Sequence, residues 1–341
     1  MERKFGKGHS MKKLHILHLG IGNVGTEVVM QVTQQKEKLK KSFGVSFHYV
    51  HQFTSKNPRE EINDAIRNIA SPFVLIDTTA SDKTIPYIAK ALRRGGFAIL
   101  VNKKPLSGKQ IDFNLLHSLG GERLFYECVV GAGLPVIRTL KDIILTDDEI
   151  VEIQGCFSGT LGYIFSQLDK GTLFSEAVLA ANKKGFTEPD PRDDLSGIDV
   201  VRKALILARL LSRKIELEDI LLEGLFPAKM QKLSAKDFLK NLPLLDMFYK
   251  EKVENTKRKG KVLRFVAKVR PHDCCVGLQE IDTSSDIGSL KGPDNLIVFK
   301  TKRYLQNPLI IKGPGAGRAV TAAGVFADLL LVAKMVQGGN V

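Results

Sequence analysis

Six charged side chains fall within sixteen positions, between residues 188 and 203. They are Glu188, Asp190, Asp193, Asp194, Asp199 and Lys203. Charged groups at the edge of an apolar core are costly unless they bind one another or a ligand. Asp199 and Lys203 are four residues apart, so a helix would place them one turn apart on the same face. A lysine in this position can hold a substrate or move a proton, and the residues alone leave both roles open.

The residues around these charges predict the start of a helix. Either Ser196 or Asp194 can cap a helix that spans residues 197–211, and acidic groups near its start suit the helix dipole. The alternative is a solvated acidic loop in front of a capped helix. That alternative explains the prolines and the cap, but it gives no role to Lys203.

A second chemical signal lies near the N-terminus. An apolar strand at residues 14–19 leads into Gly20, Ile21, Gly22, Asn23, Val24 and Gly25, and a helical pattern then runs to about residue 41. Strand, G-x-G-x-x-G and helix in this order form the dinucleotide-binding fingerprint, in which the helix N-terminus attracts a pyrophosphate. We therefore predict a dinucleotide site on this loop.

The first part of the chain alternates between strand and helix patterns. Strands are expected at residues 47–52, 73–77, 97–102 and 124–129, with helices at 60–69, 83–94 and 110–119. This alternation predicts an α/β fold with a Rossmann-type, doubly wound parallel sheet.

The end of the second predicted strand bears on the choice of cofactor. An NAD enzyme usually carries an acidic residue there, but residues 52–59 contain none. Ser55 and Lys56 can instead hold a 2′-phosphate, which favours NADP with NAD tolerated. Thr78 and Thr79 follow the third strand, at the usual edge of a dinucleotide cleft.

The second part of the chain mixes strands and helices. We expect strands at residues 152–156, 262–269, 275–281, 296–300 and 309–311, and helices at 161–184 in two pieces, 197–211 and 319–336. The charged stretch 251–261 is expected to be a loop or a frayed helix end. These patterns predict an α+β domain, and we place the boundaries at residues 1–140, 141–307 and 308–341.

Composition excludes several classes of protein. The 341 residues carry a net charge of +14, but no nucleic-acid-binding motif accompanies the scattered excess of basic residues. We find no signal-peptide pattern and no apolar run long enough to span a bilayer. Four cysteines without zinc-ligand spacing favour a reducing, cytoplasmic compartment.

Taken together, the segments with distinctive residues resemble the homoserine dehydrogenase family over nearly the whole chain. The matching segments are residues 20–25, 101–106, 131–135, 157–160, 185–203 and 313–324. The resemblance implies reversible reduction of L-aspartate 4-semialdehyde to L-homoserine with NAD(P)H, a step towards threonine, isoleucine and methionine. It also implies a second domain for catalysis and dimerisation, and a homodimer.

The resemblance assigns roles to individual residues. Lys203 and Lys103 match the family's two central lysines, and we expect Lys203 to be the acid/base group while Lys103 aids orientation, proton relay and cofactor contact. The matching substrate residues are Glu188, Asp194, Asp199, Thr160 and Gly159. Gly317 matches a glycine that returns to the cofactor. Many relatives carry tyrosine where this chain has Phe186, so a hydroxyl contact to substrate is missing or replaced.

Some relatives bind sodium through backbone carbonyls of one loop. The matching residues here are Glu127, Val130, Ala132 and Leu134. The resemblance further implies a monofunctional enzyme without an aspartate kinase or a threonine-binding regulatory (ACT) domain. Two alternatives remain: a reductase of another amino-acid semialdehyde, and a non-catalytic redox sensor that binds nucleic acid.

Overall fold

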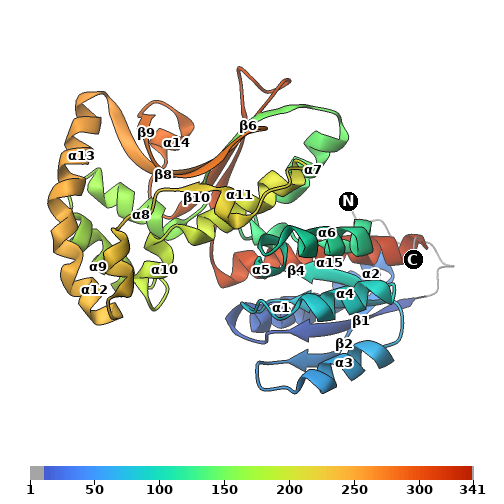
Figure 1. Ribbon diagram of the computed structural model, residues 1–341. Coiled ribbons are helices and arrows are strands. Elements are labelled where there is room, and N and C mark those ends of the chain that lie inside the picture. Colours follow the sequence, from blue (N-terminus) through green and yellow to red (C-terminus); the bar gives the residue numbers. More distant parts are fainter. Residues whose placement is uncertain (1–10, 340–341) are drawn as a thin grey trace. The chain divides into compact units, whose positions relative to one another are not determined.

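The computed structural model describes residues 11–339, which form two compact units (Figure 1). The first unit holds the chain up to Pro135 together with the chain from Ala316 onward, and the second holds Val136–Gly315. The predicted boundaries at 140/141 and 307/308 differ from these. A helix that begins at Val136 belongs wholly to the second unit, and so does the strand at Leu309–Pro314, because it pairs within the second sheet.

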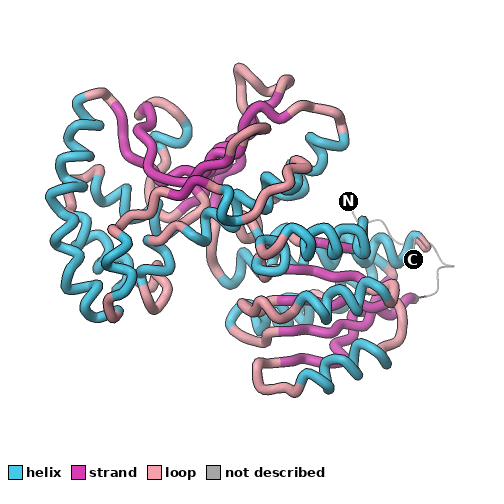
Figure 2. Tube along the Cα trace, in the orientation of Figure 1, coloured by secondary structure: helices cyan, strands magenta, loops and turns pink. Residues whose placement is uncertain are grey.

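The first unit alternates strands and helices along the chain (Figure 2). Its elements are β1 (Lys12–Leu19), α1 (Asn23–Gln34), α2 (Lys36–Phe43), β2 (Val45–Phe53), α3 (Arg59–Asn68), β3 (Phe73–Asp77), α4 (Ile85–Arg93), β4 (Phe97–Leu100), α5 (Lys104–Ser107), α6 (Gln110–Gly120), β5 (Leu124–Phe125) and α15 (Arg318–Gly338).

The five strands form one parallel sheet in the order β2-β1-β3-β4-β5. Helices α1, α2 and α15 pack on one face, and α3, α4 and α6 lie on the other. Both faces are therefore covered, which explains why β3 and β4 are continuous buried apolar runs rather than alternating ones. The predicted doubly wound parallel sheet is confirmed.

Helix α15 returns the chain to the first sheet. It is long and apolar enough to cross a membrane by length and composition, with a mean hydropathy of 1.9, so the expectation that no such run exists is wrong. Val325, Leu329 and Val332 of this helix are fully buried in the core of the first unit. The apolar composition of α15 thus matches a core helix that is buried on the sheet side.

The second unit holds the remaining elements. They are α7 (Val136–Leu145), β6 (Ile150–Cys156), α8 (Gly159–Leu168), α9 (Phe174–Lys183), α10 (Pro191–Leu195), α11 (Ile198–Leu210), β7 (Leu221–Leu222), α12 (Ala235–Asn241), α13 (Asp246–Arg258), β8 (Lys261–Val269), β9 (Cys274–Asp282), α14 (Asp286–Ser289), β10 (Asp294–Thr301) and β11 (Leu309–Pro314).

Six strands of this unit form a mixed sheet in the order β11-β10-β6-β8-β9-β7. All neighbouring strands are antiparallel except β7 and β9. Helices α8, α11 and α13 pack against these strands (Figure 1). An α+β unit in addition to a Rossmann-type unit agrees with the predicted fold class.

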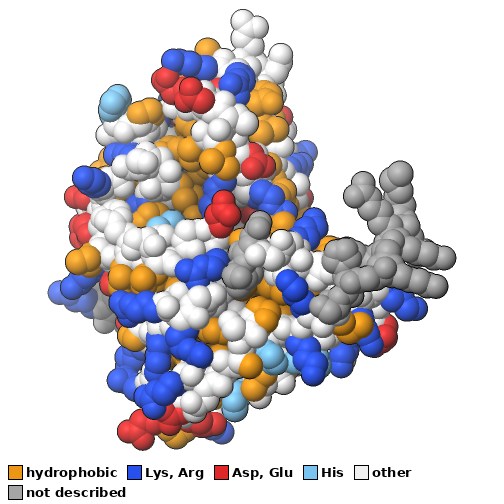
Figure 3. Space-filling view, turned by 90° about the vertical axis from the view of Figure 1, so that its right-hand side faces the viewer, with side chains coloured by type: hydrophobic (Ala, Val, Ile, Leu, Met, Phe, Trp, Pro, Cys, Tyr) orange, Lys and Arg blue, Asp and Glu red, His pale blue; other side chains and the backbone are white. Residues whose placement is uncertain are grey.

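Helix α13 corrects one expectation. Residues 251–261 were expected to be a loop or a frayed helix end, but residues 251–258 are a regular part of this helix, because Tyr249, Val253 and Thr256 form a buried stripe on one face. On the face that Figure 3 shows, Lys and Arg side chains lie among acidic, hydrophobic and other side chains.

Candidate active site

The G-x-G-x-x-G loop has the geometry that a dinucleotide needs. Gly20 adopts φ +90°, and its N–H donates to Phe53 O at 2.8 Å. A Cβ on Gly25 would lie 2.4 Å from Gly20 O, so α1 can pack this closely only with glycine there. A Cβ on Gly22 would contact nothing within 4 Å, which leaves open space at the start of α1. A pyrophosphate can approach the helix N-terminus through this space.

A pocket of about 670 Å³ lies over this loop, within the first unit. Its walls include Gly20, Ile21, Gly22, Thr78 and Thr79. The predicted loop and the predicted threonines therefore lie on one pocket. The Thr78 hydroxyl lies 2.7 Å from Gly20 O and 2.9 Å from His18 Nε2, so this side chain stabilises the glycine loop by connecting it to β1.

The pocket extends to the loop between β2 and α3. Among the described residues its wall includes Ser55 and Arg59 but not Lys56, whose side chain is exposed. Lys83 also lines the pocket. Sequence reasoning missed Arg59 and Lys83, although a basic residue at the start of the helix after the second strand is a usable signal for a phosphate.

A buried polar network connects the ends of β3 and β4. Asp77 is fully buried, and its carboxylate accepts from Thr79 N at 2.9 Å and from Asn102 Nδ2 at 3.1 Å. Asn102 Nδ2 also lies 2.6 Å from Ser81 O, while Asn102 Oδ1 accepts from Lys104 N. Burial raises the pKa of the Asp77 carboxyl, against the hydrogen bonds it accepts. The network fixes the turn after β3, which carries Thr79, and the turn after β4, which carries Lys103.

Lys103 lies between Asn102 and the short helix α5. Its backbone carbonyl accepts from Leu106 N and Ser107 N, so the residue forms the first turn of α5. The anchoring of its neighbour Asn102 therefore positions Lys103 in the first unit. Neither Asp77 nor Asn102 was singled out from the sequence, because their pairing across two strand ends has no local signature.

Lys203 lies in the second unit and is 9% exposed. Its Nζ is 2.8 Å from Asp199 Oδ2 and donates to Phe157 O at 2.7 Å. The predicted one-turn pairing of Asp199 and Lys203 on α11 is thus present. An ammonium has three N–H donors, and these two contacts use two of them. The third can bind or protonate an oxygen of a substrate.

Asp194 joins two other predicted substrate residues. Its Oδ2 accepts from Glu188 N at 2.8 Å, and its Oδ1 lies 2.9 Å from the Thr160 hydroxyl. That hydroxyl is also 2.5 Å from Phe186 O and donates to one of these two acceptors. Burial raises the pKa of Asp194 above the usual range of a carboxyl, opposed by the hydrogen bonds. Asp194 therefore organises the loop that presents the exposed Glu188 side chain.

The expected helix caps are partly wrong. The N-cap position of α11 is Gly197, which has no side chain, and Asp194 does not cap this helix. Ser196, one residue earlier, accepts from Ile198 N at the start of α11 at 3.3 Å, so its expected contribution is present. Asp190 instead caps the short helix α10, where it accepts from Arg192 N and Nε. The bonds from Arg192 lower the pKa of Asp190. Gly197 adopts φ +76° and separates α10 from α11, so the predicted helix begins one residue later than expected, at Ile198.

The two predicted glycines occupy different settings. A Cβ on Gly159, at the start of α8, would lie 2.8 Å from Pro293 O, so close packing alone requires glycine there. Gly317 is the N-cap of α15 with φ +127°, and its surroundings are open. Phe186 packs edge-on against Tyr163, with ring centroids 5.0 Å apart. The phenol ring of Tyr163 therefore lies next to Phe186.

The loop matched to the sodium site lies in the first unit. Glu127 N donates to Asp328 Oδ2 at 3.3 Å and Cys128 Sγ donates to Thr321 O, so α15 holds this loop. Ala132 adopts φ +54° within it. Among the described residues no group of three or more His, Cys, Asp or Glu side chains is placed to hold a metal ion.

Comparisons with known proteins agree with this geometry. A family model described as homoserine dehydrogenase matches residues 135–330. A homoserine dehydrogenase of Schizosaccharomyces pombe is 35% identical over 97% of this chain and 98% of its own length. A bifunctional aspartokinase/homoserine dehydrogenase of Haemophilus influenzae is 35% identical, and the match covers 94% of this chain but only 43% of that protein. A crystal structure of a Candida auris protein of unknown function has a TM-score of 0.86 at 30% identity, covering 95% of this chain and 99% of the other.

Proposed function

We propose that this chain, which belongs to the homoserine dehydrogenase family, catalyses the reversible reduction of L-aspartate 4-semialdehyde to L-homoserine with NAD(P)H. This step leads towards threonine, isoleucine and methionine. The observation that carries the proposal is the buried Lys203, held by Asp199 and by the carbonyl of Phe157. A fixed ammonium group beside an acidic loop suits a reaction that generates an alkoxide from an amino-acid aldehyde.

The residues of the first unit fit a nicotinamide dinucleotide. Gly20–Gly25 and the N-terminus of α1 would hold the pyrophosphate, with Thr78, Thr79 and Gly317 beside it. When bound, the dinucleotide supplies or accepts the hydride. The open space at Gly22 supports this assignment, because a Cβ there would occupy the approach of the phosphates.

We propose NADP as the preferred cofactor, with NAD also accepted. Ser55 and Arg59 line the pocket at the end of β2, where an NAD enzyme usually has an acidic residue. Lys56 lies in the same loop and adds a positive charge near the rim. A guanidinium can bind a 2′-phosphate in a bidentate manner, which makes Arg59 the main determinant.

Proton transfer is assigned to Lys203. In the direction of reduction, its ammonium donates a proton to the developing alkoxide oxygen, and Asp199 keeps the ammonium in place. Lys103 orients the substrate, contacts the cofactor and relays the proton. The alternative is that Lys103 donates the proton. Substitution of Lys203 distinguishes the two assignments.

The polar end of the substrate is assigned to the second unit. Glu188 is exposed and carries a negative charge that suits the substrate ammonium. Asp194 and Thr160 hold the loop that presents Glu188. Gly159 lies directly before Thr160 and keeps the backbone close to this site. Asp194 thus acts chiefly through the loop, since its Oδ2 accepts from Glu188 N and its Oδ1 lies within hydrogen-bond distance of the Thr160 hydroxyl.

We also propose a sodium site on the carbonyls of Glu127, Val130, Ala132 and Leu134. Carbonyl oxygens are suitable donors for a hard monovalent cation, and contacts with α15 fix this loop. The ion would stiffen the loop, and no chemical step depends on it.

A homodimer in the cytoplasm completes the proposal. The mixed sheet of the second unit would form the interface, and Val151 of β6 and Leu221 of β7 leave 39% and 75% of their surfaces exposed. The four cysteines Cys128, Cys156, Cys274 and Cys275 are free, in keeping with a reducing compartment.

Initial velocities with the purified protein test the function. We expect oxidation of homoserine with NADP and slower oxidation with NAD, and oxidation of NADPH with aspartate 4-semialdehyde. Turnover only with another amino-acid semialdehyde would favour the alternative reductase. No turnover with homoserine and either cofactor would contradict the proposed function.

A further inference from the structure

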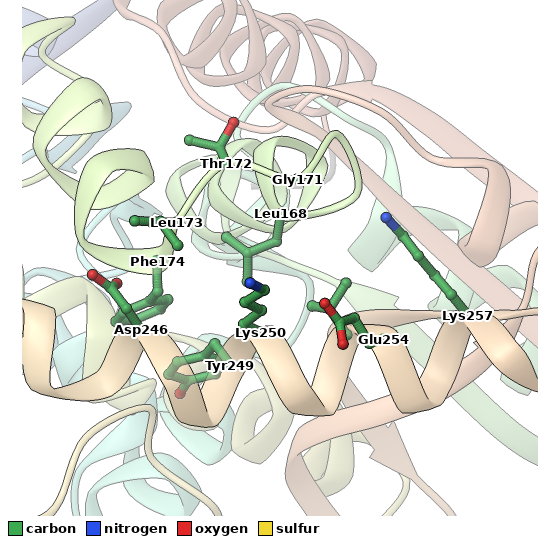
Figure 4. Close-up of a pocket in the computed structure, with 11 residues that line it drawn as sticks. Leu168, Gly171, Thr172, Leu173, Phe174, Asp246, Tyr249, Lys250, Glu254 and Lys257 are labelled. Atoms are coloured by element: carbon green, nitrogen blue, oxygen red, sulfur yellow. The ribbon is translucent and has the colours of Figure 1, made fainter.

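A second pocket lies in the second unit, between α13 and the turn that joins α8 to α9 (Figure 4). It has a volume of about 180 Å³. Leu168, Phe174, Tyr249 and Val253 form an apolar lining, and Phe174 and Tyr249 stack with ring centroids 4.0 Å apart. Nothing in the proposed reaction uses this pocket.

Two opposite charges border the pocket from one helix. Lys250 and Glu254 are one turn apart on α13, and both project towards the α8–α9 turn (Figure 4). Neither side chain has a hydrogen-bond or ion-pair partner among the residues that the structure describes. Lys257, on the same face, donates to Asp169 O at 2.9 Å. Lys250 and Glu254 therefore offer a separate positive and negative group to a ligand.

The two helix ends beside the pocket also carry opposite partial charges, one negative and one positive. The C-terminal end of α8, at Leu168, carries partial negative charge, and the N-terminal end of α9, at Phe174, carries partial positive charge. Asp246 fixes the start of α9, because its carboxylate accepts from Ser175 N and Ser175 Oγ at 2.7 Å each. The pocket thus presents both signs of charge over an apolar floor.

We propose that this pocket binds a small zwitterionic α-amino acid. The ligand carboxylate would pair with Lys250, its ammonium with Glu254, and a short side chain would lie on Leu168 and Val253. A volume of about 180 Å³ corresponds to roughly six water molecules, and therefore to a ligand of about six to eight non-hydrogen atoms. Alanine, serine and valine are in this range, whereas larger amino acids are not.

The same two helices connect the pocket to the substrate residues. Thr160 lies at the start of α8, and the loop with Phe186 and Glu188 follows the end of α9. The hydrogen bonds of Thr160 with Phe186 O and Asp194 close this far end of the helix pair. A ligand that draws the near end of α8 and α9 onto α13 would shift the far end. We therefore expect the amino acid to change KM for homoserine with little change in kcat, an expectation that rests on the proposed function.

Calorimetry with the full chain tests the binding without any need for turnover. L-alanine and L-valine are the probes, with acetate and ethylammonium as singly charged controls and L-tryptophan as an oversized one. Binding should weaken at least tenfold in Lys250→Met and in Glu254→Gln. It should be unchanged in Glu251→Gln, which alters an exposed carboxylate outside the pocket lining. Binding should also persist in Lys203→Met, where the proposed substrate site is altered.

Several outcomes would overturn the site. These are the absence of binding, equal binding of acetate or ethylammonium, and binding that survives both Lys250→Met and Glu254→Gln. For the coupling, alanine should change KM for homoserine at least threefold, with a limiting value at saturation, and Glu254→Gln should abolish the change. A KM that rises without limit, as in competition at the substrate site, would contradict the coupling, and so would an unchanged KM.

Discussion

Lys203 Nζ lies 2.8 Å from Asp199 Oδ2, one turn away on α11, at the point where the helix enters the core. The lysine side chain is largely buried, whereas the aspartate side chain is 44% exposed. The pair therefore adds little to stability by itself, because solvent screens the exposed partner. Its consequence is geometric, since Asp199 and Phe157 O together fix the direction of the ammonium group.

Asp199→Asn should lower kcat about 10- to 100-fold with a small change in KM. The amide keeps the shape but loses the charge that holds the Lys203 ammonium, and misplacement of a proton donor costs this much. Steady-state kinetics checks this, because loss of a positioning contact lowers kcat while KM stays nearly unchanged. Asp193→Asn, on the exposed side of α10, is the matched control, and an equal loss there would argue against a specific role for Asp199.

Gly22→Ala and Gly25→Ala should separate cofactor binding from folding. A Cβ at position 22 meets nothing in the protein but fills the approach to the α1 N-terminus, so the Kd for NADPH should rise at least tenfold with unchanged stability. A Cβ at position 25 would lie 2.4 Å from Gly20 O and should cost about 1–3 kcal/mol. Thermal melts and NADPH fluorescence titrations measure the two effects. Tight NADPH binding by Gly22→Ala would remove the pyrophosphate from this loop.

Asn102→Ala should reduce both stability and turnover. The substitution removes one hydrogen bond that the buried Asp77 carboxylate accepts, which costs about 1–3 kcal/mol, while the bond from Thr79 N remains. The turn that carries Lys103 loses its anchor at the same time. Lys103→Met, in contrast, should lower turnover with little change in melting temperature. If Asn102→Ala melts like wild type, the network does not position this turn.

Acid should destabilise the first unit through His18. Burial lowers the pKa of this imidazole to about 4, and its Nε2 bonds the Thr78 hydroxyl. The unfolded chain therefore binds a proton more readily than the native one, so this stabilising contribution is complete above pH 6.5 and is lost as the pH falls towards 4. The loss from pH 7 to pH 4.5 is about 2 kcal/mol.

His18→Phe keeps a ring next to Tyr49 and removes the titration. Urea unfolding at pH 7 and pH 4.5 should give a smaller acid loss for this variant than for wild type. Equal losses for the two proteins would show that His18 does not contribute to the pH dependence.

Local patterns predicted much of the first unit from sequence. The strand, the glycine loop and helix α1 have a fixed order, and β3 lies at residues 73–77 as expected. Helix α13 was missed because its charged residues hide a narrow buried stripe at Tyr249 and Val253, which only tertiary packing reveals. The predicted start of α11 was inaccurate for a similar reason, because a charge pattern does not reveal the positive φ of Gly197.

The candidate site was predictable only in part. The spacing of Asp199 and Lys203 predicts their ion pair, because both lie on one helix. The contact of Lys203 with Phe157 O joins residues 46 positions apart through a backbone atom, and a sequence pattern carries no sign of it. Arg59 was not predicted because the fold of the loop brings it to the same pocket as Ser55, and the sequence does not show that fold.

The turnover of Lys203→Met tests the central claim most directly. Methionine keeps the length of the side chain and removes its charge, so the protein should fold, bind NADPH with an unchanged Kd, and lose at least 1000-fold in kcat for homoserine oxidation. Lys103→Met serves as the comparison, and a smaller loss is expected there because it is not the proton donor. Turnover within tenfold of wild type in Lys203→Met, with folding and NADPH binding intact, would contradict the assignment of Lys203 as the acid/base group.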